Sequence, residues 1–108
     1  MEARRPGSTA ALNALNSIEE MVLDDQTLDQ LFSDVGHHAM SIEVFFRDGR
    51  PPSVATRAGA LIVAREALKQ GTTRGIHLRY RQRDVECWDT LTPRPAGADL
   101  VRFSFWFE

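Results

Sequence analysis

The stretch that decides the fold is GIHLRYRQRDVECWDT, residues 75–90. Its first half alternates between apolar and charged positions. The apolar positions are Ile76, Leu78 and Tyr80, and between them come His77, Arg79 and Arg81. A period of two is that of a β-strand with one buried and one solvated face. A polar break at Arg83-Asp84 then returns the chain through Val85 to Leu91, which predicts a β-hairpin with one charged face.

Two further segments share this period and predict strands beside the hairpin. Residues 40–47 place Met40, Ile42, Val44 and Phe46 on one side, and Ser41, Glu43, Phe45 and Arg47 on the other. Residues 100–108 place Val101, Phe103, Phe105 and Phe107 on one side, and Arg102, Ser104 and Trp106 on the other. In each strand the more apolar side is expected to face the core. The segment TPRPAGAD, residues 92–99, predicts a loop before the last strand.

Three segments have helical spacing. The apolar residues Leu12, Leu15, Ile18 and Val22 recur every three or four positions and predict a first helix from Ser8 or Thr9 to about Leu23. The segment TLDQ, residues 27–30, has the pattern of a capping box with Thr27 as the cap. It predicts a second helix that ends near Gly36 and buries Leu28, Leu31 and Phe32.

A third, longer helix is predicted from Ser53 as its cap to about Gln70, with Gly71 as its stop signal. Its apolar stripe consists of Val54, Ala58, Leu61, Ile62 and Leu68. Before it, Asp48-Gly49 predicts a turn, and Pro51-Pro52 excludes helix and sheet.

The predicted element order is α-α-β-α-β-β-β. This order indicates an α+β fold with a four-stranded, mainly antiparallel sheet and its helices packed on one face. The length of 108 residues fits a single domain, residues 1–108, in which residues 1–7 are expected to form a flexible tail.

Composition restricts the classes of protein to be considered. A net charge of −2 gives no bulk attraction to nucleic acid or to a membrane surface. Cys87 is the only cysteine, so an intrachain disulfide is excluded and a reducing compartment is favoured. No apolar run approaches the length of about 18 residues that a membrane span requires, and the first residues do not have the pattern of a secretory signal. We expect a soluble, cytoplasmic protein.

The sheet face that points away from the helices is the most informative predicted surface. Alternation places arginines and aromatic rings on it together, and the candidate binding residues are Phe45, Arg79, Arg81, Trp88, Arg102 and Trp106. Tryptophan and arginine are enriched at the centres of interfaces, and an exposed aromatic patch usually marks an interaction site. The sequence therefore predicts a non-enzymatic binding or assembly module, most simply a homodimer that associates through this face.

Two alternatives concern the same face. It could be covered within one subunit, by an N-terminal helix or by the aliphatic stems of arginines. It could instead bind RNA or a nucleotide, since rings stacked on a sheet and flanked by arginines bind bases in some RNA-binding proteins. Against nucleic acid, Lys69 is the only lysine, and Glu43 and Glu86 share the face and would repel phosphate.

Catalytic and metal-binding patterns are weak, and no cofactor is expected. His37, His38, His77 and Cys87 do not have the spacing of a metal site. Cys87 is expected to be a small core residue, and Asp89 is interpreted as capping a turn at the end of its strand rather than as a general acid or base. The sequence contains no phosphate-binding loop, nucleophile elbow or catalytic carboxylate pair.

The segments IHLRYRQRDVECWDTLTP and ADLVRFSFWFE, which end the chain, resemble the strand–hairpin–strand endings of small bacterial proteins encoded by mobile integron gene cassettes. The clearest element of the resemblance is Trp-Asp-Thr-Leu at residues 88–91. The resemblance implies a small α+β domain that self-associates, and it assigns no activity and no functional residue.

Overall fold

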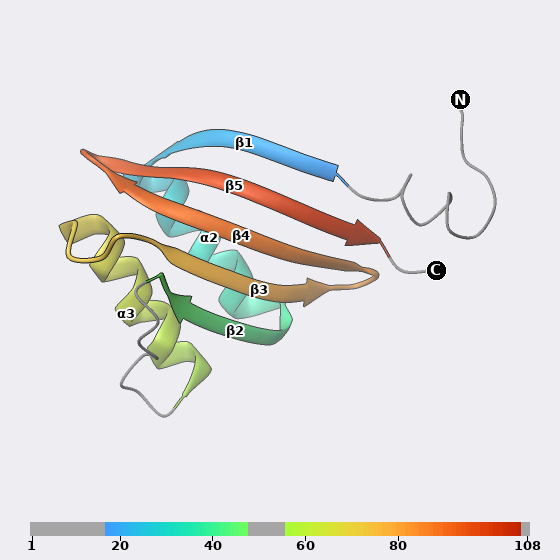
Figure 1. Ribbon diagram of the computed structural model, residues 1–108. Helices are drawn as coiled ribbons and strands as arrows, with labels where there is room; N and C mark the ends of the chain where they lie inside the picture. Colours follow the sequence, from blue (N-terminus) through green and yellow to red (C-terminus); the bar gives the residue numbers. More distant parts are fainter. Residues whose placement is uncertain (1–16, 48–55, 107–108) are drawn as a thin grey trace.

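The computed structural model describes residues 17–47 and 56–106, which form an α+β fold (Figure 1). Five antiparallel strands make one sheet in the order β1-β5-β4-β3-β2. The elements along the chain are β1 (Ser17–Asp24), α2 (Asp25–His38), β2 (Met40–Phe46), α3 (Arg57–Gln70), β3 (Ile76–Gln82), β4 (Val85–Arg94) and β5 (Gly97–Trp106). The predicted class is confirmed, but the sheet has five strands instead of four.

The additional strand, β1, corrects the first predicted helix. From Ser17 to Asp24 the chain pairs with β5 without interruption, and the part of that helix before Ser17 lies outside the described residues. Ile18 and Val22 are each 66% exposed. A spacing of four is even, so it places two residues on the same side of a strand as well as on the same side of a helix. The spacing of Ile18 and Val22 therefore fitted both structures.

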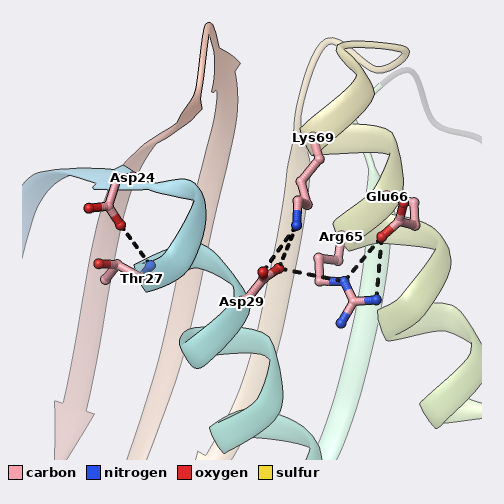
Figure 2. A network of polar contacts seen from close by, with 6 residues as sticks. All are labelled: Asp24, Thr27, Asp29, Arg65, Glu66 and Lys69. Atoms are coloured by element: carbon pink, nitrogen blue, oxygen red, sulfur yellow. Dashed lines mark hydrogen bonds and ion pairs between the residues drawn. The ribbon is translucent and has the colours of Figure 1, made fainter.

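The helix α2 begins one turn earlier than predicted. Asp24 is its N-cap, and the side chain of Asp24 accepts a hydrogen bond of 2.7 Å from the backbone N–H of Thr27 (Figure 2). The hydrogen bond lowers the pKa of the Asp24 carboxyl group. Thr27 is thus the donor at this cap rather than the cap itself. Leu28 and Phe32 are buried as predicted, and Leu31 packs at the margin of the core.

The helix α3 also has a different cap. The hydroxyl of Thr56 accepts a hydrogen bond of 2.9 Å from the N–H of Gly59, whereas Ser53 lies outside the described residues. Gly71 ends the helix in the left-handed conformation, as predicted. The buried stripe consists of Ala60, Leu61, Ala64 and Leu68. Ile62 belongs to the predicted stripe but is exposed, as is Ala58.

Both helices pack on the same side of the sheet, which confirms the predicted layering. One core cluster joins their apolar residues to the inward residues of the strands: Leu28, Phe32, Leu61, Ala64, Leu68, Ile76, Leu78, Tyr80, Cys87, Leu91 and Leu100 are among its members. Asp29 of α2 accepts two hydrogen bonds of 3.0 Å from the ammonium group of Lys69, and its carboxylate lies 3.8 Å from Arg65 Nε (Figure 2). These contacts connect α2 with α3 at the surface.

The two hairpins of the sheet have tight turns. Arg83 and Asp84 connect β3 with β4 as predicted, and Arg83 has a positive φ of 54°. The predicted loop over 92–99 is wrong, because β4 continues to Arg94 and β5 begins at Gly97. Only two residues separate these strands. Ala96 there has a φ of 62° and follows Pro95, whose ring holds φ near about −65°, and this combination is that of a type II turn.

The orientation of β5 corrects a second prediction. Cys87, Asp89 and Leu91 face the helices, and their partners on β5 are Ser104, Arg102 and Leu100. Directly paired residues project from the same side of a sheet. Arg102, Ser104 and Trp106 therefore lie on the side of the helices, and Val101, Phe103 and Phe105 lie on the opposite side. Alternation separated the two sets correctly, but the more apolar set is the outer one.

The predicted turn at Asp48-Gly49 and the segment with Pro51, Pro52 and Val54 lie outside the described residues, as does Phe107. Within the described part of the chain, neither helix is long and apolar enough to span a membrane.

Candidate functional site

The side of the sheet that the helices leave uncovered, called here the open face, is the candidate functional site. Directly paired residues of neighbouring strands form rows of side chains across this face. Its members are Ile18, Glu20, Val22, Met40, Glu43, Phe45, His77, Arg79, Arg81, Glu86, Trp88, Thr90, Thr92, Arg94, Asp99, Val101, Phe103 and Phe105. The prediction that Met40 faces the core is wrong, because the register of β2 shifts between Met40 and Glu43 and Met40 pairs with the outward Arg81. The members come from every strand, so the whole sheet builds this surface.

An aromatic cluster occupies the centre of the open face. The ring of Trp88 meets Phe103 and Phe105 edge-on, with centroids 6.5 and 5.1 Å away. Phe103 and Phe105 are 4.4 Å apart. Such tilted and T-shaped arrangements are the favourable ones for aromatic pairs. The cluster is therefore ordered by contacts of its own before any partner arrives.

Charged groups hold Trp88 from two directions. The guanidinium carbon of Arg79 lies 4.6 Å from the ring centroid, within the range of a cation–π interaction. The same Arg79 donates a hydrogen bond of 3.1 Å to Glu43 on β2. The indole N–H of Trp88 donates one of 2.6 Å to Glu86. These bonds fix the orientation of the ring while leaving the side chain 40% exposed.

Aliphatic side chains extend this cluster toward β1. Ile18 and Val22 are each 66% exposed and Val101 is 41% exposed, while Phe45 on the opposite margin is 45% exposed. Exposed apolar patches on protein surfaces are often interaction sites, which makes this face the candidate site. Sequence reasoning missed Ile18, Val22, Val101, Phe103 and Phe105 as members of the face, because β1 was taken for a helix and β5 was turned over.

Of the six predicted binding residues, the structure places four on the open face: Phe45, Arg79, Arg81 and Trp88. The other two, Arg102 and Trp106, lie on the side of the helices. Their placement on the exposed face was wrong, since the partner of Trp106 on β4 is Val85, which packs against the core. The orientation of β5 could have been inferred from one pair of opposite charges. Asp89 on β4 falls on the core side of the predicted hairpin, and Arg102 on β5 is a residue that could neutralise it there.

Arg102 instead forms a buried ion pair with Asp89. Its Nε and one terminal nitrogen donate hydrogen bonds of 2.8 and 2.9 Å to the two carboxylate oxygens. The hydroxyl of Tyr80 donates a third, of 2.8 Å, to the same carboxylate. Asp89 is buried and lies in the middle of β4, so its interpretation as a turn cap is wrong. A carboxylate with three charge-assisted or hydroxyl donors is well compensated for its loss of water.

The groups around this ion pair have shifted pKa values. Burial, and secondarily the charge of Asp89, raises the pKa of Tyr80. Burial likewise raises the pKa of Cys87, although Arg102 opposes the shift. The hydrogen bond to Asp89 raises the pKa of Arg102. The three shifts favour the neutral thiol of Cys87, the neutral phenol of Tyr80 and the charged guanidinium of Arg102. A neutral thiol is a poor nucleophile, so these groups are suited to stabilising the fold.

These shifts predict a loss of stability in alkaline solution. Below about pH 8.5 the thiol and phenol are protonated in both the folded and unfolded chains. At higher pH the unfolded chain releases these protons while the folded chain retains them, so the free energy of unfolding falls by up to about 1.4 kcal/mol per pH unit for each group. Urea titrations from pH 7 to 11 should show this fall, and Tyr80→Phe should reduce the slope above pH 10. An equal slope in the variant would contradict the assignment.

A hollow of about 760 Å³ lies between the end of α2 and the β3–β4 hairpin, and its lining includes Asp34, His38, Arg83 and Cys87. Burial raises the pKa of the Cys87 thiol, which makes Cys87 a poorer nucleophile than a free cysteine. Among residues 17–47 and 56–106, no three histidine, cysteine, aspartate or glutamate side chains are grouped so that they could hold a metal ion.

No family model matches the chain, and no curated protein or solved structure is significantly similar to it. The resemblance to proteins of integron gene cassettes therefore stays a prediction.

Proposed function

We propose that the protein is a non-enzymatic assembly module that forms a homodimer through the open face. The observation that carries the proposal is the aromatic cluster of Trp88, Phe103 and Phe105, which continues into exposed Ile18 and Val101 on the side without helices. Solvated sheet faces normally carry polar residues. A partner that covers this surface would remove several large apolar side chains from water.

The dimensions of the open face fit a second copy. Five strands about 4.8 Å apart, with about 3.3 Å per residue over seven residues, give a projected area on the order of 550 Å². The relief of the side chains increases the accessible area toward the roughly 800 Å² per partner of a standard interface. Two such sheets stack about 10 Å apart, as in a β-sandwich.

A two-fold arrangement of two copies brings apolar side chains together. A two-fold axis parallel to the strands, between the sheets, places β1 of one copy over β2 of the other. Ile18 and Val22 on β1 of each copy then meet Phe45 on β2 of its partner, which makes the surface self-complementary.

Binding of RNA or a nucleotide is the alternative function of the same face. The geometry is less suited to it, because Arg79 already covers Trp88 and the phenylalanines meet each other. Bases need free ring faces for stacking. Glu20, Glu43 and Glu86 also lie on the open face and would repel phosphate.

Light scattering tests the dimer. The wild-type chain should show twice its monomer mass of 12.2 kDa. We expect Trp88→Glu and Ile18→Glu each to weaken dimerisation at least about thirtyfold, which is the effect of losing a central interface contact. Because Ile18 is largely exposed, its replacement leaves the monomer fold intact, and circular dichroism verifies this.

The matched control is Ile62→Glu, which alters an apolar side chain on α3 that is 54% exposed and lies away from the open face. This variant should remain dimeric. A monomeric wild-type chain, as expected if the protein's own N-terminal residues cover the face, would refute the proposal. A gel shift of labelled single-stranded RNA that weakens steeply with salt would support the nucleic-acid alternative instead.

A further inference from the structure

The outer edge of β1 is a second candidate surface, which adjoins the open face and shares Ile18, Glu20 and Val22 with it. β1 is the last strand of the sheet, and β5 is its only strand partner within residues 17–47 and 56–106. Its eight residues pair with β5 in unbroken register, from Ser17 opposite Ser104 to Asp24 opposite Gly97. Such a strand presents on its far side a row of backbone N–H and C=O groups that can pair with another chain.

The opposite edge of the sheet is built differently. Along β2 the register shifts between Met40 and Glu43, and Ser41 has a positive φ of 56°. Bulges and irregular backbone of this kind prevent a further strand from pairing. β1 has no register shift, no proline and no residue with a positive φ. Of the two edges, only β1 is regular enough to act as a template.

The side chains of β1 indicate the chemistry of what would pair there. Five consecutive residues from Ile18 to Val22 are exposed, and they are apolar at three positions and acidic at two. Glu19 and Glu20 form no ion pair with any described residue, and β1 contains no basic residue. The strand thus offers apolar contacts on both of its faces and one carboxylate on each face.

We propose that the edge of β1 binds an extended basic segment of a partner protein, which adds to the sheet as a sixth, antiparallel strand. Backbone hydrogen bonds would supply affinity, and alternate side chains would supply specificity. Lysine or arginine opposite Glu19 and Glu20 would form favourable cross-strand pairs, and apolar residues opposite Ile18 and Val22 would complete the rows.

A second copy fits this edge less well than a basic segment does. Two β1 strands paired across a two-fold axis bring four glutamates into a short stretch of sheet. Pairing centred at Glu20 places identical carboxylates directly opposite each other, and like charges in that position are destabilising. The open face and the β1 edge therefore differ in their expected partners. Because Glu20 belongs to both surfaces, light scattering must show that a variant at Glu20 keeps the oligomeric state of the wild type.

The test uses the blocked peptide TVVKKVT, whose lysines fall opposite Glu19 and Glu20 in an antiparallel pairing. Added at millimolar concentration to the isotope-labelled full chain, it should shift the backbone amide resonances of Ser17–Asp24. The double variant Glu19→Lys, Glu20→Lys should weaken binding about tenfold. The double variant Asp34→Lys, Glu66→Lys makes the same change in net charge on the helices and should bind like the wild type.

Two further peptides separate strand pairing from charge attraction alone. TVVEEVT lacks the basic residues and should bind much more weakly. Two versions of TVVKKVT are N-methylated, one at the odd-numbered and one at the even-numbered residues, so that each has the N–H groups of one edge blocked. Only the version whose blocked edge faces β1 should lose binding, because that edge must donate its N–H groups to β1. Absence of shifts with TVVKKVT, equal binding of TVVEEVT, shifts confined to the open face, or β1 shifts that depend only on protein concentration would each overturn the proposal.

Discussion

Replacing Asp89 with alanine is expected to lower the free energy of unfolding by about 3–5 kcal/mol, because the change leaves the guanidinium of Arg102 without its buried partner. Asp89 is buried and accepts three hydrogen bonds, two from Arg102 and one from Tyr80. The variant loses all three at once, while Arg102 remains partly enclosed. Urea denaturation monitored by tryptophan fluorescence measures the effect.

A matched control is Asp99→Ala. Asp99 also accepts a hydrogen bond of 2.8 Å from an arginine, Arg94, but the side chains of this pair are each 47% exposed. Exposed pairs contribute less than about 1 kcal/mol, so this variant should be nearly as stable as the wild type. The double replacement Asp89→Leu, Arg102→Met should recover much of the lost stability, since it removes the buried charge altogether. If Asp89→Ala cost no more than Asp99→Ala, the importance of the buried pair would be disproved.

The substitution Gly97→Ala is expected to destabilise the protein by about 3 kcal/mol or more. A Cβ atom at position 97 would lie 1.9 Å from the carbonyl oxygen of Leu23 and 3.1 Å from Cα of Asp24. Both neighbours are backbone atoms of β1, so no side-chain rotation relieves the clash. The φ of Gly97, +155°, adds strain for any residue with a side chain. Thermal unfolding should show a large fall in Tm.

Gly71→Ala is the matched control for this substitution. Gly71 has a φ of +68°, but a Cβ atom built there meets nothing within 4 Å. Its replacement should therefore cost only the conformational strain, about 1 kcal/mol. Equal losses for the two variants would show that conformation, and not the close approach of β1 to Gly97, limits the choice of residue.

The parts of the fold that could be predicted from the sequence have apolar residues at a spacing that fits only one kind of element. They are also bounded by a turn or stop residue close by in the sequence. The β3–β4 hairpin was predictable because alternation from Ile76 to Arg81 is strict and the break at Arg83-Asp84 is short. The helix α3 was predictable because Gly71 stops it after a long alanine-rich segment. In both cases interactions between near neighbours determine the structure.

The parts that did not follow depend on long-range pairing. Ile18 and Val22 satisfy a helix and a strand equally, and only pairing with β5, about eighty residues later, selects the strand. The register at the Pro95-Ala96 turn decides which side of β5 is buried. There the buried ion pair places Arg102 inward and leaves Phe103 and Phe105 outside. Four of the six predicted binding residues were still on the open face, because β3, β4 and the part of β2 after Met40 had been oriented correctly.

The pairing of β1 with β5 also has a consequence for the order of folding. The strands β3, β4 and β5 are consecutive hairpins whose contacts are local and can form early. β1 is synthesised first among the described strands, whereas its partner β5 is synthesised last. β1 therefore cannot pair with β5 until nearly all of the described chain has been translated. During that interval its apolar and acidic residues are accessible to chaperones or to other nascent chains. Closure of β1 onto β5 should then be a late step, slowed by the entropy of bringing distant segments together.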